Sequence, residues 1–242
     1  MGRKAPTPLE RYKTICWMKL VQQVSGKSAY MLEYELFPHL HGRKYWYYDR
    51  PRILEKYQVG KVVPTVEPYN LNSNVLKIDK LYPNTLWLFT HRFWRAVDPS
   101  PSLLKYIDFD FYELNKDIKT DLFCGRSSES PVGFPFKRAK LLKDDIDEIA
   151  SEGTLGSFTV LMLLLNEAKL EGRMGMYWQV LYAFDDYYRL LVDIPYFFDE
   201  GENILAYVDS LHPYRYSSAT GERVPVVRLS WKTGESCNFD EL

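Results

Sequence analysis

The chain has 242 residues, of which 46% are hydrophobic and 16% aromatic, and its net charge at pH 7 is −1. These values exclude a disordered chain, because the apolar side chains are numerous enough to form a core. The length suits one large domain or two small ones.

Targeting and redox signals are absent from the sequence. The longest apolar run, Phe158 to Leu165, is far shorter than the roughly 20 residues that a membrane-spanning helix needs. The N-terminus has no secretory signal pattern. Cys16, Cys124 and Cys237 are too widely spaced for a zinc site or a disulfide framework. We therefore expect a cytoplasmic protein that does not enter a membrane and that needs no metal or cofactor.

The charge is distributed unevenly along the chain. Residues 1–100 carry 16 Lys and Arg against 8 Asp and Glu, whereas residues 101–242 carry 15 against 24. The basic half indicates a module that faces an anion, although mutual attraction of the two halves is an alternative. The Pro-rich break at Asp98–Pro101 predicts a basic helical domain over 1–98 and an acidic, aromatic-rich domain over 102–242.

Helical signals dominate the first half. A helix is predicted over 9–24, between a Thr7 cap and Gly26, and Ser28 caps a second helix that ends before Pro38. The insert 39–49 is either a hairpin or an ordered loop. A short basic helix then starts near Pro51 and ends at Gly60, and further helices are predicted up to Tyr82 and over 85–97.

The second half is also predicted to be helical. Residues 103–114 fit a strand or a helix, and 124–136 read as a loop. Helices are expected over 140–150, 155–171, 176–192 and 203–211, and Val224–Trp231 is the clearest strand. The predicted fold class is mainly α: an N-terminal helix-turn-helix-like helical module with an inserted loop, followed by a C-terminal helical bundle with little β.

The helix order over residues 9–82 is similar to that of a known family. The segments SGKSAYMLEYEL, RILEKYQVGKVVP and NLNSNVLKIDKLYP resemble the DNA-binding domain of Cro/phage-repressor-type (XRE-like) helix-turn-helix regulators. The resemblance implies a bacterial or phage-like regulatory protein that inserts the start of its third helix into the major groove of DNA. The insert Pro38–Asp49 departs from the family's short turn and puts the rigid two-helix unit in doubt, unless it is an added contact loop.

Most of the candidate nucleic-acid-binding residues are cationic or aromatic, and the exception is Ser28, whose hydroxyl is predicted to cap a helix. Arg and Lys near a helix start can reach phosphates or guanine edges, and neighbouring aromatic rings can stack on single-stranded bases. The alternative is an ordinary solvated face above buried aromatic rings. The predicted set is Ser28, Arg43, Lys44, Trp46, Arg50, Arg52, Lys56 and Lys61.

Signals for an enzyme are weaker, and no catalytic residue is assigned. His39 and His41 could ligate a metal ion, but no third ligand lies near them in the sequence. Asp108, Asp110 and Glu113 could bind a divalent cation in a metal-dependent nuclease, although such spacing is more typical of a solvated helix face. The sequence therefore leaves enzymatic activity open, although the balance of these signals is against it.

The aromatic residues between 177 and 198 allow another function. Aromatic stripes at helical spacing are usually core, but so many rings could also form an interaction surface. In that alternative the protein is an adaptor or a subunit of a larger complex. The C-terminal aromatic helices are expected to bind a protein partner or a second copy in both readings, and in this alternative the protein does not contact nucleic acid. The rings concerned are Tyr177, Trp178, Tyr182, Phe184, Tyr187, Tyr188, Tyr196, Phe197 and Phe198.

Overall fold

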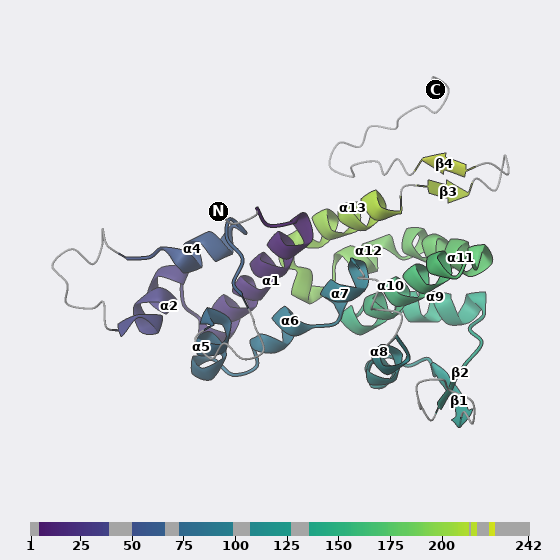
Figure 1. Cartoon of the computed structure of the whole chain (residues 1–242), viewed down its shortest axis with the longest axis horizontal. Helices are drawn as coiled ribbons and strands as arrows, with labels where there is room; N and C mark the ends of the chain where they lie inside the picture. The colour runs from purple at the N-terminus through teal and green to yellow at the C-terminus, as the bar shows by residue number, and fades with distance from the viewer. Residues whose placement is uncertain are drawn as a thin grey trace, which may run out of the picture.

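The computed structural model describes residues 5–38, 50–65, 73–98, 107–126, 136–212, 214–216 and 223–225. Most of these residues are helical and the strands are short, so the predicted mainly α class is confirmed (Figure 1). Across the described ranges, every helix is either too short or too polar to cross a lipid bilayer.

The first half folds into short helices that follow one long one. Thr7 and Glu10 form a capping box at the start of the long helix, and Gly26 ends it with a φ of +66°. The predicted helix over 9–24 is thus confirmed. The predicted helix over 85–97 is interrupted, because His91 has an extended backbone between two short helices. The helices are α1 (Pro8–Ser25), α2 (Ala29–Leu36), α4 (Ile53–Gln58), α5 (Asn74–Leu81), α6 (Leu86–Thr90) and α7 (Phe93–Val97).

The second half is built around one apolar helix. Nearly every residue of α10 (Leu155–Leu170) is buried, and α7, α9 and α11 pack against it. The other elements are α8 (Ile107–Leu114), η3 (Asn115–Asp117), β1 (Phe123–Arg126), β2 (Phe136–Arg138), α9 (Lys143–Ser151), α11 (Met174–Asp186), α12 (Tyr188–Val192), η4 (Pro195–Glu200), α13 (Gly201–Leu211), β3 (Tyr214–Tyr216) and β4 (Arg223–Pro225).

Four of the predictions for this half can be compared with the structure. The described part of 103–114 is helical, as α8. The loop predicted over 124–136 is wrong at its ends, where β1 pairs with β2 in an antiparallel ladder. The single helix predicted over 176–192 is wrong, because Tyr187 leaves helical geometry and lets Leu191 and Val192 turn into the core. The predicted strand from Val224 is described only as far as Pro225, where β4 pairs with β3.

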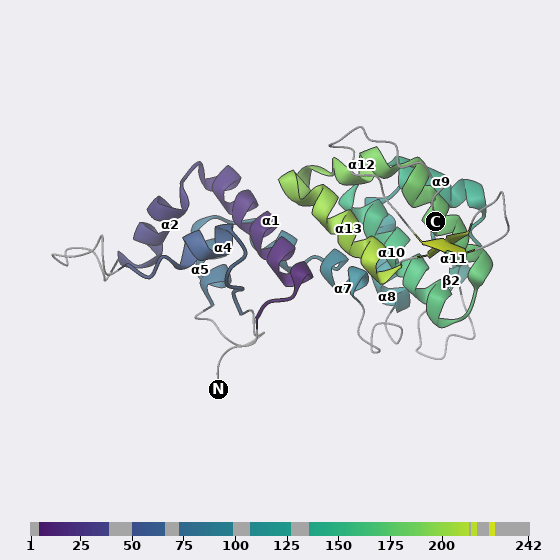
Figure 2. The same cartoon turned by 90° about the horizontal axis from the view of Figure 1, so that it is seen from above.

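Buried side chains form two cores, and α1 belongs to both. The smaller core contains Trp17, Met18, Val21, Ala29, Leu32, Leu36, Leu54, Tyr57, Val75, Ile78 and Phe89. The larger core surrounds α10 and also takes Leu9, Cys16 and Leu20 from α1. Figure 2 shows α1 lying between the group of α2, α4 and α5 and the group of α9 to α13. Two adjacent faces of one helix therefore join the halves of the protein.

His212 is a buried titratable group at the end of α13. Burial lowers its pKa to about 4, Lys169 adds to the shift, and its Nδ1 lies 3.2 Å from the Tyr177 hydroxyl. Above pH 6.5 the ring is neutral in both the folded and unfolded states. Between pH 6.5 and 4 only the unfolded chain takes up the proton. The free energy of unfolding therefore falls by about 3 kcal/mol as the pH is lowered through this window.

The pH dependence provides a test of this burial. The free energy of unfolding of the unmodified protein should fall more steeply from pH 6.5 to pH 4 than that of His212→Gln. Urea denaturation at several pH values measures both curves. Parallel curves would show that His212 titrates normally in the folded protein.

Candidate nucleic-acid interface

α4 is the short helix around which the described basic residues of the predicted set lie: Arg50 and Arg52 precede it, Lys56 is on it, and Lys61 follows it. A helix of six residues is not stable alone, so tertiary contacts must hold it. Leu54 and Tyr57 are buried in the smaller core, and the Tyr57 ring meets Trp17 edge to face at 6.0 Å. α4 therefore sits at a fixed place against α1 and α2.

Glu33 fixes the start of α4 from the neighbouring helix α2. Its side chain is completely buried, and its Oε1 accepts the backbone N–H groups of Ile53 and Leu54. These two N–H groups have no partner inside a helix, and a negative charge at this end also suits the helix dipole. Glu33 is thus a cap for α4 that comes from 20 residues earlier in the chain.

Arg50 is held inward and does not join an exposed patch. Its side chain is only 8% exposed and forms ion pairs with Glu33 and Glu55. The guanidinium carbon also lies 4.6 Å from the centre of the Tyr30 ring. The charge of Arg50 is therefore already matched, and this residue positions the start of α4 instead of offering donors to a ligand.

Arg52 directly precedes α4, Lys56 lies on it and Lys61 follows its end, and all three are exposed. The Lys56 amide donates to the Arg52 carbonyl at 3.2 Å, and the Lys61 amide donates to the Lys56 carbonyl at 2.9 Å. Arg52 has a φ of +51° and is not itself helical, but these backbone hydrogen bonds place it one turn before Lys56, and they place Lys61 just after the helix end.

Arg11 on α1 joins these three residues, and the sequence analysis missed it. Gly60 has a φ of +61°, and a Cβ placed there would be 3.1 Å from the Cβ of Arg11. The end of α4 therefore touches α1 at Arg11, next to Lys61. Gly60 in the sequence indicates a turn or a close approach of the backbone, but no sequence pattern shows that the neighbour is Arg11.

We call Arg11, Arg52, Lys56 and Lys61 the cationic row. All four side chains are exposed. Among the described residues, no carboxylate oxygen lies within 4.0 Å of the charged nitrogen atoms of these side chains, so none of the four forms a salt bridge there. By contrast, several other cations, among them Lys19, Lys27, Arg92 and Arg95, pair with a carboxylate.

The remaining predicted residues are not brought into this row. Ser28 is exposed at the start of α2, where its hydroxyl accepts the Met31 amide at 3.3 Å and caps the helix. Arg43, Lys44 and Trp46 lie outside the described residues. The structure thus brings together part of the predicted set, adds Arg11 and turns Arg50 inward.

The carboxylates weighed for a nuclease make other contacts. Asp110 is buried and accepts hydrogen bonds from Arg92 at 2.6 Å and from Arg95 at 2.6 and 2.7 Å. Glu113 pairs with Lys116 at 3.2 Å. Among the described residues, no group of three His, Cys, Asp or Glu side chains is arranged to hold a metal ion.

Of the nine predicted aromatic rings of the C-terminal helices, three are buried, five are half-buried and one is exposed. Tyr177, Phe184 and Phe197 are buried in the larger core, and Tyr196, at 38% exposure, is the most exposed member of the predicted set. Phe158 meets Phe184 edge to face at 5.4 Å. These rings build the core, as such stripes usually do. Binding of a protein partner by these helices stays a prediction.

Comparisons of the chain with protein-family models, with curated protein sequences and with solved structures found no match. The function must therefore be argued from the residues and their geometry.

Proposed function

We propose that the protein binds nucleic acid, with DNA as the expected target, through phosphate contacts made by the cationic row. One observation carries the proposal: four exposed cationic side chains, at the two ends of α4, on α4 itself and on the adjoining part of α1, have no carboxylate partner among the described residues. Lys and Arg side chains of this kind supply most of the affinity of proteins for nucleic acid.

The support around the row favours a rigid contact surface. Glu33 and Arg50 fix the start of α4, and Tyr57 packs its middle against Trp17. Preorganised side chains lose less conformational freedom when they bind, which favours affinity. The resemblance to Cro/phage-repressor-type domains supports the same surface, because its third helix corresponds to the segment that carries Arg52 and Lys56.

The salt dependence of binding tests the proposal quantitatively. If the row neutralises four phosphates, the logarithm of the association constant should fall with the logarithm of salt concentration at a slope of about −3.6. Fluorescence anisotropy with a labelled duplex, and with one of its strands alone, measures the slope and the preference for duplex DNA. Each Lys→Gln change in the row should reduce the slope by about 0.9.

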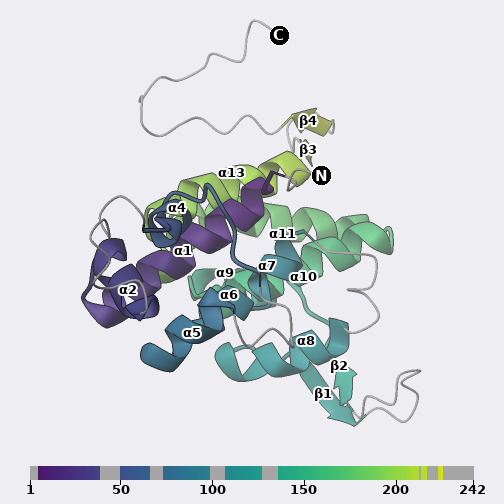
Figure 3. The same cartoon turned by 60° about the vertical axis from the view of Figure 1, so that its left-hand side comes forward.

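A matched lysine provides the control. Lys80 is exposed at the end of α5 and, like the row, has no carboxylate partner in the described part of the chain. α4 packs against α1 whereas α5 packs against α2 and α6, and in the view of Figure 3 α4 lies above α1 and α5 below it. Lys80→Gln should leave the slope unchanged, whereas Lys56→Gln and Lys61→Gln together should lower it. Binding that the double variant leaves intact, or no binding at low salt, would contradict the proposal.

A further inference from the structure

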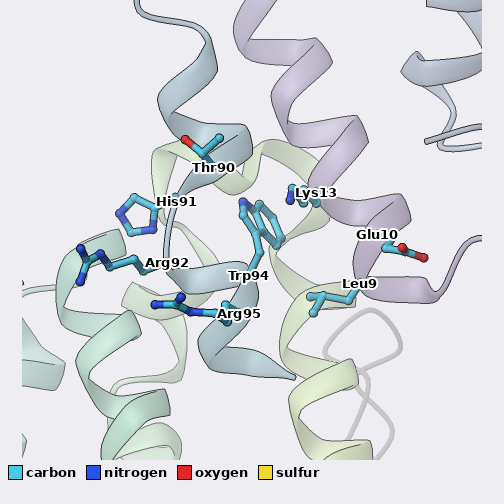
Figure 4. Close-up of a pocket in the computed structure, with 8 residues that line it drawn as sticks. All are labelled: Leu9, Glu10, Lys13, Thr90, His91, Arg92, Trp94 and Arg95. Carbon is cyan, nitrogen blue, oxygen red and sulfur yellow. The ribbon is translucent and has the colours of Figure 1, made fainter. Parts of the chain in front are cut away.

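A cavity of about 430 Å³ lies between the first half of α1 and the turn that joins α6 to α7 (Figure 4). Its floor includes Trp94, and Leu9 adds an apolar wall. The remaining lining residues are Glu10, Lys13, Thr90, His91, Arg92 and Arg95. Lys13 and Arg11 are two positions apart on α1 and therefore face different sides of the helix. The cavity is thus separate from the cationic row.

Lys13 brings an unmatched charge to this cavity. It is half-buried, and within the described residues its ammonium group makes no hydrogen bond and no ion pair. Its Nζ lies 4.2 Å from the centre of the Phe89 ring. Burial lowers the pKa of Lys13, and Glu10 opposes that shift. The Phe89 ring and the more distant Glu10 offset this burial only in part, so an anion placed beside Lys13 would be stabilised.

Arg92 and Arg95 provide a second positive end. Both guanidinium groups bind the single carboxylate of Asp110, so one positive charge is in excess and several N–H donors have no partner in the described part of the chain. Asn166 donates to the carbonyl of Ala96 at 2.7 Å and fixes α7 on α10. These contacts hold the two arginines in place before any ligand arrives.

His91 contributes a neutral donor on the same side. Its Nδ1 accepts the Phe93 amide at 3.1 Å, so in the neutral ring the proton is on Nε2. Burial, together with Arg92, lowers the pKa of His91 to about 4, which keeps the ring neutral near pH 7. In Figure 4, His91 and the two guanidinium groups lie on one side of the Trp94 ring, and Lys13 lies on the other.

We propose that this cavity is a binding site for a small organic dianion, of the dicarboxylate class, which lies across Trp94 with one acidic group toward Lys13 and the other toward Arg92 and Arg95. Two positive ends on either side of the Trp94 ring favour a ligand with an acid at each end and a short apolar body between. The Glu10 carboxylate also lines the cavity, but it accepts the Thr7 amide at 2.7 Å and points away from Trp94 (Figure 4). The inference does not depend on nucleic-acid binding, since it uses other residues on another side of α1.

Isothermal titration calorimetry with succinate, glutarate and adipate tests the proposal on the full chain, with butyrate as the matched monocarboxylate. At least one dicarboxylate should bind saturably and about tenfold or more tightly than butyrate, because its second acidic group gains charge-assisted hydrogen bonds. If no dicarboxylate binds more tightly than butyrate, the proposal is wrong.

Variants identify the site. Lys13→Met keeps the length of the side chain and should reduce dicarboxylate affinity to the level of butyrate, whereas Lys80→Met on α5 should have no effect. Arg95→Gln provides a second variant, because Arg92 still pairs with Asp110. The assignment is wrong if Lys13→Met and Arg95→Gln both keep their helical circular dichroism and both bind the dicarboxylate with unchanged affinity. A different result would also overturn the assignment. If duplex DNA displaces the dicarboxylate and Lys13→Met weakens DNA binding, the cavity belongs to a phosphate-binding surface.

Discussion

Glu33→Ala is expected to lower the free energy of unfolding by about 3 kcal/mol, because it removes one partner of a buried ion pair. The change leaves the N–H groups of Ile53 and Leu54 without their acceptor, and it leaves the enclosed Arg50 guanidinium with Glu55 alone. Urea denaturation followed by circular dichroism measures the loss. Because α4 would lose its anchor, nucleic-acid binding should weaken as well, although the cationic row itself is unchanged.

Glu35→Gln is the control for this prediction. Glu35 lies on the same helix, two positions further on, but its ion pair with Lys27 is partly exposed. Surface pairs contribute little to stability, so its loss should be much smaller than that of Glu33→Ala. If the two variants have equal urea-denaturation midpoints, Glu33 does not anchor α4.

Gly201→Ala should produce a second large loss of stability, also of about 3 kcal/mol, because the added methyl group has no room. A Cβ at Gly201 would lie 2.1 Å from the carbonyl oxygen of Val192. The clash is with backbone and not with the end of a flexible side chain. The start of α13 and the end of α12 would have to separate, which would disturb the larger core beside Ile204 and Leu191. Thermal and urea denaturation both report the change.

Gly175→Ala offers a matched comparison in another helix. Gly175 lies in the first turn of α11, and a Cβ there would meet nothing within 4 Å. Alanine at this position should be neutral or should stabilise the protein by up to about 1 kcal/mol, because it reduces the freedom of the unfolded chain. If Gly201→Ala behaves in the same way, α12 and α13 do not approach as described.

Local signals allowed the fold class and several helices to be predicted from the sequence. Thr7 and Gly26 bound α1 because capping depends on residues next to the helix end. The break at Tyr187 and the pairing of β1 with β2 were missed because they depend on distant contacts. Leu191 turns into the larger core, and Phe136 stacks on the Tyr112 ring of α8 at 5.1 Å. No window of local sequence contains those partners.

The candidate site was predictable only in part for the same reason. Lys56 and Lys61 were identified because a basic helix bounded by Gly60 is a local pattern. Arg50 looked equally basic in the sequence, but its partner Glu33 lies 17 residues earlier, so its burial could not be inferred. Arg11 and Lys13 belong to a helix with ordinary amphipathic spacing, and only packing distinguishes their roles.

The sharing of α1 between two cores limits how the protein can be divided. A fragment ending after α7 would keep the smaller core but would present Leu9, Cys16 and Leu20 to water, together with Phe93 and Trp94. A fragment starting after α7 would lack the helix against which η4 and α13 pack. Neither piece has a complete apolar interior, so shortened versions for binding experiments should retain α1 and its contacts on both sides.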